Sequence, residues 1–391
     1  MEHIGVFFGS RSPEHDVSII TAQLVIAGLK ALGKNIVPVY IDKHGNWFLG
    51  SLLGNLSVFQ SGEIDSVKKR LGKFTIDLEK SKGKLVFHKL GLVGGKEITI
   101  DLAFPTFHGS YGEDGTVQGL FEMFDIPYVG CGVASSAIAM DKVLTKQYYQ
   151  MYGFPTTKFL FYLYKDWNSR KKSILAEVSR RLRFPVFIKP ARLGSSIGIQ
   201  KVKGKKNLEF AFEVAFHYDE KVIVEESVDN LVDITCCVIG NSKPIASKLQ
   251  ESIFQSTFFS FEEKYLKKGG AQLGKAKGNI IIPARVSDRI TKEIQKTAEE
   301  IFACLECRGI ARIDFLHDAK KNVFFANEIN PLPGTLYHHL WKASGIEFPK
   351  LLELLLDFAR ESHEGRKRVT YTFQSDILRQ GGGAKLKGFF P

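Results

Sequence analysis

Cysteine is scarce in this chain of 391 residues, and long apolar runs are missing altogether. The five cysteines are odd in number and do not describe the disulfide framework of a small secreted protein. The single C-x-x-C pair, Cys304 and Cys307, has neither a second pair nor a nearby histidine cluster, so no metal is expected on sulfur. The longest apolar runs, such as Leu354–Leu356, fall far short of the roughly 20 residues that span a bilayer. These shortages exclude a disulfide scaffold and argue against a zinc site or a transmembrane helix.

The chain also lacks a targeting segment and two nucleotide-binding fingerprints. Met1-Glu2-His3 leads directly into an apolar strand, with no basic region and no small-residue cleavage site, which predicts a cytoplasmic protein. No G-x-G-x-x-G follows the first predicted strand, so hydride transfer loses its main support. The loop after Lys189 lacks the Gly-Lys-Ser/Thr of a Walker A motif.

Acidic residues are outnumbered in this chain. The 54 Lys and Arg exceed the 42 Asp and Glu, which gives a net charge of +12. Such an excess attracts anions, and these could be nucleic acid, a membrane surface or a nucleotide. The basic residues form short scattered clusters typical of solvated faces, such as Arg366–Arg368. The net charge alone therefore does not identify which of these anions is the partner.

The order of predicted elements indicates an α/β protein. A strand at Ile4–Phe8, a helix at about Ser18–Leu32 and a strand at Ile36–Ile41 form a β-α-β start. Residues 50–96 are polar and weakly periodic, and we interpret them as an excursion with short strands. The core resumes with a predicted strand at Ile98–Phe104.

The sequence pattern changes near residue 130, and we place the first expected domain boundary there. The middle part has a predicted helix at about Met140–Tyr152, and the last part has a helix capped by Ser287. Further predicted elements are strands at Val186–Lys189, Ile199–Val202, Val222–Glu226, Ala311–Phe315 and Val323–Ile329, and a helix at about Pro349–Ala359. The expected domains are residues 1–130, 131–233 and 234–365, and the tail at 366–391 has no clear fold signal.

The most informative residues lie on the last two predicted strands. Alternate residues of a strand share a face, so Arg312 and Asp314 point the same way, as do Glu328 and Asn330. If these strands pair, two carboxylates and an amide oxygen converge beside a guanidinium. Hard oxygen ligands of this kind suit Mg²⁺ bound together with nucleotide phosphates. The alternative is a cross-strand salt bridge in which Arg312 neutralises a carboxylate.

A second candidate site follows the strand that ends at Lys189. The loop with Gly194, Ser195, Ser196 and Gly198 can place backbone N–H groups and an ammonium around phosphate oxygens. The alternative is a plain turn between two hairpin strands. Later in the chain, Glu225 ends an apolar strand, where a hinge could contact the edge of an adenine.

Glu14 and His108 follow two other predicted strands. Ligands of open α/β sheets bind beyond the carboxyl ends of strands, so Glu14 is well placed to meet a substrate cation. The structural alternatives are capping of the following helix by Asp16 or Ser18, and a histidine that serves only the fold.

Several ordered motifs connect these residues. They are Ser12-x-Glu14-His15-x-Val17-Ser18, His108-Gly109-x-x-Gly112-Glu113-Asp114-Gly115-x-x-Gln118-Gly119, Met140-Asp141-Lys142, Lys189-Pro190, Gly194-Ser195-Ser196-x-Gly198, Glu262-x-Lys264-Tyr265, Arg312-x-Asp314 and Asn327-Glu328-Ile329-Asn330-Pro331-x-Pro333-Gly334. In this order, over about residues 1–360, they resemble the D-alanine–D-alanine ligases of the ATP-grasp superfamily.

The resemblance implies a three-domain ATP-grasp architecture with an N-terminal Rossmann-like (pre-ATP-grasp) parallel sheet. It implies D-alanine as substrate, ATP as co-substrate, two Mg²⁺ ions for which Mn²⁺ can substitute, and a homodimer. Neither nucleic acid nor a membrane is an expected partner.

The resemblance also assigns roles to residues of this chain. The residues expected to hold ATP are Lys142, Lys189, Ser196, Glu225, Val228, Asp233 and Lys264, and those expected to hold metal are Asp314, Glu328 and Asn330. The catalytic and substrate-binding residues implied are Glu14 for the first ammonium, a triad of Glu14, Ser195 and Tyr265, His108 near the first carboxylate, and Arg312 with the Gly334 N–H for the oxyanion. Asp233 stands where the family usually has Glu.

The implied reaction is ATP-dependent ligation of two D-alanines through an acyl phosphate, for peptidoglycan precursor synthesis. A loop at about Phe258–Gly274 is expected to close over the site. The chain after Gly334 is shorter than in the family and places Thr335 where a Ser binds the acceptor's carboxylate. A second hypothesis is therefore an ATP-grasp ligase with a different acceptor. A third, a non-catalytic anion-binding protein, is disfavoured because the metal- and phosphate-binding residues are all present.

Overall fold

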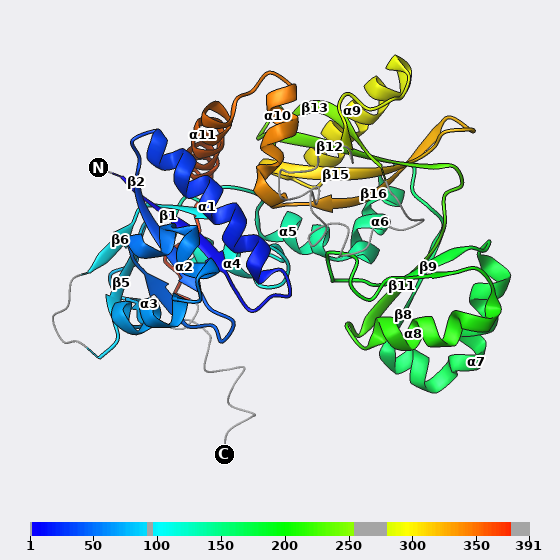
Figure 1. The fold of residues 1–391 in the computed structure, drawn as a ribbon, viewed down its shortest axis with the longest axis horizontal. Coiled ribbons are helices and arrows are strands. Elements are labelled where there is room, and N and C mark those ends of the chain that lie inside the picture. The colour runs from blue at the N-terminus through cyan, green and yellow to red at the C-terminus, as the bar shows by residue number, and fades with distance from the viewer. Residues whose placement is uncertain (1, 92–96, 254–279, 377–391) are drawn as a thin grey trace.

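Three β-sheets organise the chain, with helices packed around them (Figure 1). The structure is a computed structural model that describes residues 2–91, 97–253 and 280–376. The sheets and helices confirm the predicted α/β class. Over these described ranges, the helices are too short or too polar to cross a membrane.

The N-terminal sheet has a parallel centre. Its elements are β1 (His3–Gly9), α1 (His15–Ala31), β2 (Asn35–Ile41), β3 (Trp47–Leu49), β4 (Phe74–Ile76), β5 (Leu85–Lys89), β6 (Ile98–Ile100), β7 (Leu102–Pro105) and α4 (Thr116–Met123). The order is β6-β5-β4-β3-β2-β1-β7, with β2, β1 and β7 parallel and the remaining pairs antiparallel. Within β1, Val6 and Phe8 pack on the side of α1 and Phe7 on the side of α4, because neighbouring residues of a strand face opposite ways.

The middle part begins with α5 (Val133–Met140) and α6 (Lys142–Met151), which pack against the third sheet (Figure 1). The rest of the middle part forms a separate lobe (green in Figure 1). The elements of this lobe are β8 (Phe159–Leu163), α7 (Tyr164–Arg181), β9 (Val186–Pro190), β10 (Gln200–Val202), α8 (Leu208–Phe216) and β11 (Lys221–Glu226). The antiparallel sheet β10-β9-β11-β8 buries Val186 and Ile188 against α7 and α8. Phe187 and Lys189 alternate with them on β9 and therefore face the other way, toward the third sheet.

The third sheet lies above the lobe in Figure 1. Its elements are β12 (Leu231–Gly240), β13 (Ile245–Ser252), β14 (Ile280–Ile281), α9 (Asp288–Cys304), β15 (Gly309–Asp318) and β16 (Val323–Asn330), in the strand order β14-β13-β12-β15-β16. Ile313 and Phe315 of β15 pack against α9. The expected Ser287 cap is confirmed, since its side chain accepts a hydrogen bond from the Ile290 N–H.

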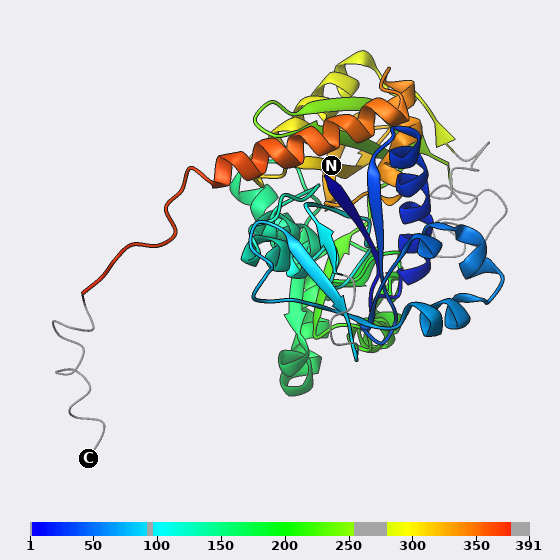
Figure 2. The same cartoon turned by 90° about the vertical axis from the view of Figure 1, so that its left-hand side faces the viewer.

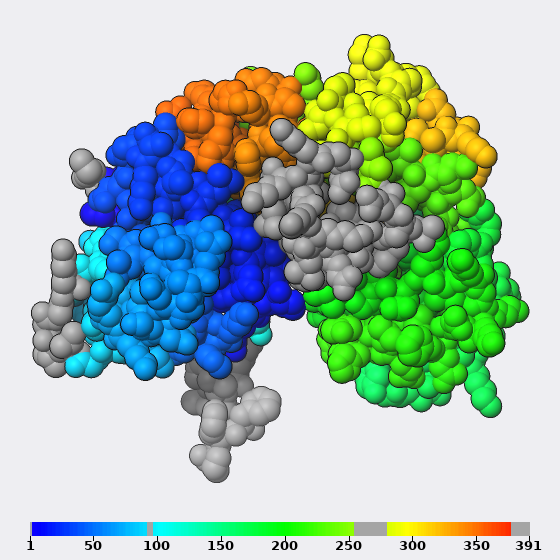
Figure 3. Space-filling model, in the orientation of Figure 1, coloured from blue at the N-terminus to red at the C-terminus, as the bar shows by residue number. Residues whose placement is uncertain are grey.

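The last helices return to the N-terminal sheet. They follow a short turn at Gly334–Tyr337 and are α10 (His338–Ala343) and α11 (Phe348–Arg366). Leu351, Leu355 and Trp341 share one buried cluster with Val25 of α1. Figure 2 shows α11 crossing the molecule, with the chain leading away from its end. In Figure 3 the N-terminal part (blue) and the middle lobe (green) occupy opposite ends of the same face. The expected domain boundaries stay predictions.

Two expected regions differ in part from the structure. The short strands expected within residues 50–96 are confirmed by β4 and β5, but the described part of this range also contains two short helices that were not predicted, α2 (Leu56–Gln60) and α3 (Ile64–Leu71). The single strand expected at Ile98–Phe104 is two strands that pair differently, β6 with β5 and β7 with β1. The break falls at Asp101, whose carboxylate accepts a hydrogen bond from the His3 N–H.

The helix expected at about Met140–Tyr152 is confirmed as α6, and it begins after Asp141, whose side chain caps it through Val143 and Leu144. The preceding helix α5 was not predicted, and two other helices differ in their bounds. Helix α1 begins at His15, earlier than expected, and α11 extends to Arg366. Helices α7 and α8 were not predicted.

Candidate active site

Two adjoining hollows lie where the three parts of the chain meet. The large cleft, about 1120 Å³ with its open mouth, separates the middle lobe from the third sheet. The small cavity, about 660 Å³ when its open mouth is included, lies between the N-terminal part and the same sheet. Six residues line both hollows: Lys142, Leu193, Gly194, Ser195, Arg312 and Glu328. These six residues form a shared wall, so ligands in the two hollows would meet there.

The large cleft holds the expected acidic hairpin. Strands β15 and β16 pair antiparallel, with Asp314 opposite Glu328 and Arg312 opposite Asn330. Arg312 donates to both Asp314 oxygens, at 2.7 Å from Nη2 to Oδ2 and 3.0 Å from Nε to Oδ1. Thr235 donates to Asp314 at 2.9 Å. The predicted convergence is confirmed, and the salt bridge exists as well, along one strand rather than across two.

The acidic hairpin has the oxygen ligands that Mg²⁺ prefers. Within the described ranges, no group of three or more His, Cys, Asp or Glu could hold a metal by itself. Two carboxylates and an amide oxygen are, however, the kind of partial set that binds Mg²⁺ together with substrate phosphates. Burial raises the pKa of the Asp314 carboxyl, Arg312 opposes the rise, and Glu328 adds to it. The residues present therefore fit a cation that arrives with a nucleotide; their role as ligands stays a prediction.

Two lysines enter the large cleft from the middle part. Lys142, at the start of α6, donates to the Leu193 carbonyl at 2.8 Å and lies 3.9 Å from Glu328 Oε2. Lys189 on β9 forms an ion pair with Glu225 on the neighbouring β11. Both ammonium groups thus lie close to carboxylates that line the same cleft.

The remaining expected nucleotide residues also line the large cleft. They are Ser196, Glu225, Val228 and Asp233. Glu225 is 2% exposed. Burial works to raise its pKa, but Lys146 and Lys189 outweigh this and hold the pKa of the Glu225 carboxyl well below its usual range. Sequence reasoning missed Lys146, which comes one helical turn after Lys142; that i, i+4 spacing was the available signal.

The small cavity holds Glu14 and His108, as expected. Glu14 stands at the N-cap position of α1, and the Ser195 hydroxyl donates to its carboxylate. The structural alternative, in which Asp16 or Ser18 caps α1, is wrong: the cap has no side-chain hydrogen bond, and Ser18 instead links the Gly9 N–H to the Thr106 carbonyl.

Two glycines allow the loops to approach Glu14. A Cβ on Gly109 would lie 2.9 Å from Glu14 Oε2, and a Cβ on Gly194 would lie 2.8 Å from the same atom. Gly109 also has φ of +74°, which strains other residues. Side chains at these positions would displace the carboxylate from its present place between the two loops.

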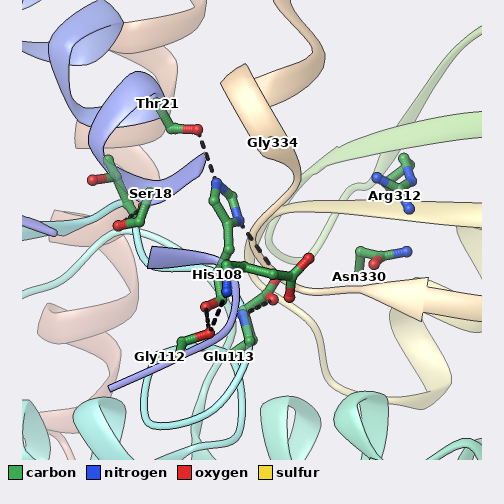
Figure 4. Close-up of polar contacts among 12 residues, drawn as sticks. Ser18, Thr21, His108, Gly112, Glu113, Arg312, Asn330 and Gly334 are labelled. Carbon is green, nitrogen blue, oxygen red and sulfur yellow. Dashed lines mark hydrogen bonds and ion pairs between the residues drawn. The ribbon is translucent and has the colours of Figure 1, made fainter. Parts of the chain in front are cut away.

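His108 is fixed by partners on both sides (Figure 4). Its Nε2 lies 2.8 Å from the Thr21 hydroxyl of α1, and its Nδ1 lies 3.9 Å from Glu113 Oε1. Glu113 in turn accepts from the Gly109 N–H at 2.5 Å. Arg312 and Asn330 lie across the cavity in the same view. His108 is therefore oriented by a network that sequence reasoning did not anticipate.

The turn after Gly334 has an unusual backbone. Thr335, Leu336 and Tyr337 have φ of 50°, 54° and 47°, a left-handed run that is costly for residues other than glycine. The Thr335 N–H donates to the Thr21 hydroxyl at 3.2 Å, and its own hydroxyl donates to the Gly334 carbonyl at 2.8 Å. Gly334 lines the small cavity, whereas Thr335 does not line either hollow. The acceptor-binding role of Thr335 stays a prediction.

Two expected site residues, Lys264 and Tyr265, lie outside the described residues, as does the expected closing loop at Phe258–Gly274. The other expected residues line one or both hollows around the shared wall. Thr335 is the exception: it follows Gly334 in the chain and lines neither hollow.

Two family models match the chain. The model described as "D-ala D-ala ligase N-terminus" matches residues 3–131, and the one described as "D-ala D-ala ligase C-terminus" matches residues 148–357. Among curated proteins, "D-alanine--D-alanine ligase" of Thermosipho africanus is 38% identical over 97% of this chain and 98% of its own length. The protein of the same description from Geobacillus kaustophilus is 36% identical over 95% and 98%.

Solved structures show the same architecture. The D-alanine-D-alanine ligase from Coxiella burnetii has a TM-score of 0.78 at 30% identity and covers 94% of this chain and 96% of its own. The VanG D-Ala:D-Ser ligase from Enterococcus faecalis has a TM-score of 0.78 at 31% identity, with 92% and 99% covered. The predicted ATP-grasp architecture is thereby confirmed.

Proposed function

The chain belongs to the D-alanine–D-alanine ligase family, and from that premise we propose that it joins two D-alanines to D-alanyl-D-alanine with conversion of ATP to ADP and phosphate. The family identifies an enzyme that forms a carbon–nitrogen bond. The observation that carries the proposal is the shared wall, which borders both a nucleotide-sized cleft and a small polar cavity. Membership in this family overturns the hypothesis of a non-catalytic anion-binding protein.

The first step is transfer of the ATP γ-phosphoryl group to the carboxylate of one D-alanine. A free carboxylate is a poor electrophile because the departing oxygen is too basic, and phosphorylation creates a good leaving group. Lys142, Lys189 and Arg312 carry the positive charge that would meet the phosphoryl oxygens from the walls of the large cleft. Mg²⁺, held by Asp314, Glu328 and Asn330, would supply further neutralisation of charge when bound.

The second step is attack by the amine of the other D-alanine on the acyl phosphate. The carbon–nitrogen bond forms, the carbon–oxygen bond to phosphate breaks, inorganic phosphate leaves, and the proton of the amine passes to the departing phosphate. Glu14 would hold the ammonium of the first D-alanine, since its carboxylate lines the small cavity and Ser195 orients it. Arg312 and the Gly334 N–H would stabilise the oxyanion, because both residues border the same cavity.

A different acceptor is the second candidate function. The turn after Gly334 is shortened, and Thr335 does not line the small cavity. The VanG D-Ala:D-Ser ligase has the same TM-score as the D-alanine-D-alanine ligase from Coxiella burnetii, so the architecture accommodates more than one acceptor. Activation of D-alanine is common to both candidates, and only the attacking group differs.

Product identification separates the two candidates. The full chain is incubated with ATP, Mg²⁺ and D-alanine, with D-serine, D-lactate and L-alanine as competing acceptors, and products are identified by mass spectrometry. D-Alanyl-D-alanine with one ADP per dipeptide supports the first candidate. A mixed product supports the second, and no nucleotide turnover with any acceptor contradicts both.

The same premise extends to the setting of the enzyme. We propose a cytoplasmic homodimer that supplies the peptidoglycan precursor pathway, with ATP and D-alanine as its small-molecule partners. Sedimentation equilibrium tests the dimer, and a monomer at micromolar concentration would contradict it.

A further inference from the structure

One buried lysine has no part in the proposed mechanism. Lys146 on α6 is 1% exposed, although a lysine is rarely buried unless it is paired. Its ammonium lies 2.9 Å from Glu225 Oε2, 3.0 Å from the Thr157 hydroxyl and 3.1 Å from the Thr156 hydroxyl. Lys146 does not line the large cleft, so it cannot itself contact a nucleotide there.

The two oxygens of Glu225 have different partners. Oε2 faces Lys146 and accepts from the Thr157 hydroxyl at 2.8 Å, whereas Oε1 faces Lys189. Lys189 lines the large cleft and is expected to serve the phosphates. Oε2 of Glu225 is thus held by Lys146 and Thr157, which do not line the large cleft. Oε1 is held by Lys189, which lines the cleft and which a nucleotide would engage.

The groups behind Glu225 are tied to the rest of the site. Thr156 donates to the Ala326 carbonyl on β16, the strand that carries Glu328 and Asn330. Lys146 also lies one turn after Lys142, which belongs to the shared wall. The position of Glu225 is therefore coupled to both sides of the large cleft rather than to its own strand alone.

We propose that Lys146 is a positioning residue that, with Thr157, holds the Glu225 carboxylate as an acceptor for the exocyclic amino group of adenine while Lys189 serves the phosphates. This inference rests on the proposed function, because it takes ATP as the nucleotide in the large cleft.

The chemistry of a carboxylate explains why the placement of Glu225 would determine which nucleotide base is preferred. An ionised carboxylate only accepts hydrogen bonds, so it favours the 6-amino group of adenine and repels the 6-oxo group of hypoxanthine. Without Lys146, Glu225 loses the amino group that faces its Oε2 and depends more strongly on Lys189. Lys189 is then less available to the phosphates, and Glu225 is less firmly placed against the base.

The test is steady-state kinetics of the Lys146→Met variant with ATP and with ITP, the 6-oxo analogue, at saturating D-alanine. We expect the KM for ATP to rise about 10-fold or more, and the preference for ATP over ITP in kcat/KM to fall by a similar factor, as for loss of a charged hydrogen bond. We expect kcat at saturating ATP to stay within about threefold. Unchanged KM and preference, or an equal loss of kcat with both nucleotides, would overturn the proposal.

A second variant covers the case in which Lys146→Met does not fold. Thr157→Val keeps the side-chain shape and removes the hydroxyl that donates to Glu225. It should shift the KM for ATP and the ATP preference in the same direction by about 3-fold, and no shift would overturn the proposal. Lys171→Met is the matched control, because Lys171 lies on the surface of the middle lobe beside Glu209 and Glu213. It should leave both quantities unchanged.

Failure of the proposed function is distinguishable from failure of this inference. If the unmodified protein makes no product, calorimetric binding of ADP and IDP replaces the kinetics. Lys146→Met should then weaken ADP binding about 10-fold and narrow the difference between ADP and IDP. Equal affinities of the variant and the unmodified protein for ADP would overturn the inference whatever reaction the enzyme performs.

Discussion

The large cleft and the small cavity share a wall but are built in different ways. Most polar residues of the large cleft stand on paired strands, where alternation and register place Asp314 of β15 opposite Glu328 of β16. Several polar groups of the small cavity stand on loops that are far apart in the chain: Glu14, His108 and Gly334. Register positions the first set, whereas hydrogen bonds between loops position the second.

This difference decides how each hollow responds to a change. A substitution on a strand of the large cleft leaves the strand register intact. We therefore expect it to remove only the chemical contribution of the substituted side chain. In the small cavity, Ser12 donates to the His108 carbonyl at 2.7 Å, and Thr21 joins His108 to the Thr335 N–H. Loss of one hydrogen bond there should displace several groups together.

The largest expected effect comes from Asp314→Asn, which should disable the large cleft alone. Removal of a carboxylate that we propose binds Mg²⁺ should lower kcat for ADP release by about 10²–10³-fold, because charge in the transition state is then no longer balanced. Coupled-enzyme detection of ADP measures it. Asp318→Asn, the same change on the same strand, should leave kcat nearly unchanged, and equal losses in the two variants would contradict the assignment.

The next effect should separate the small cavity from the large cleft. Glu14→Gln removes the charge that we propose meets the substrate ammonium, so the KM for D-alanine should rise about 10–100-fold. Calorimetric binding of ADP should not change, because Glu14 does not line the large cleft. A loss of ADP affinity equal to the loss for D-alanine would show that the two hollows are not independent.

A smaller effect should reveal the network of loops. Thr21→Val keeps the side-chain shape but removes the hydroxyl between His108 and the Thr335 N–H. The KM for D-alanine should rise about 3–10-fold, and the free energy of unfolding should fall by about 1–3 kcal/mol because a buried N–H loses its partner. Urea unfolding and initial rates measure the two effects. Thr116→Val, at an exposed position on α4, is the control.

The smallest effect concerns pH and the helix that follows the Gly334 turn. Burial, followed by the charge of His338, lowers the pKa of His339 to about 4. The unfolded chain binds this proton at about pH 6.5, so the contribution of His339 to stability is complete above that pH and declines as the pH falls toward 4. Urea unfolding at pH 7 and pH 5 should show that the free energy of unfolding declines less for His339→Asn than for the unmodified protein. Identical declines in the two proteins would contradict the lowered pKa of His339.

The sequence predicted the large cleft better than the small cavity, for a physical reason. Alternation along Arg312–Asp314 and Glu328–Asn330 is a local pattern, and pairing of adjacent strands turns it directly into a site. The resemblance supplied Glu14 and Ser195, whose contact joins two distant loops and follows from no local pattern.

Other features could not be read from the sequence. The left-handed run at Thr335–Tyr337 involves residues that disfavour that conformation, so only tertiary contacts explain it. Helices α2 and α3 are too short to show clear periodicity. The buried contact of Lys146 with Glu225 joins α6 to β11, and a solvated lysine would have the same sequence signature.

The most direct test of phosphoryl transfer at the shared wall traces an oxygen atom from the carboxylate of D-alanine to inorganic phosphate. D-Alanine labelled with ¹⁸O in its carboxylate is converted with ATP, and the phosphate and nucleotide products are examined by mass spectrometry. Transfer of the γ-phosphoryl group to the carboxylate predicts one ¹⁸O atom in each inorganic phosphate formed and none in ADP. Phosphate without ¹⁸O, or label in a nucleotide monophosphate, would contradict activation by phosphoryl transfer at this wall.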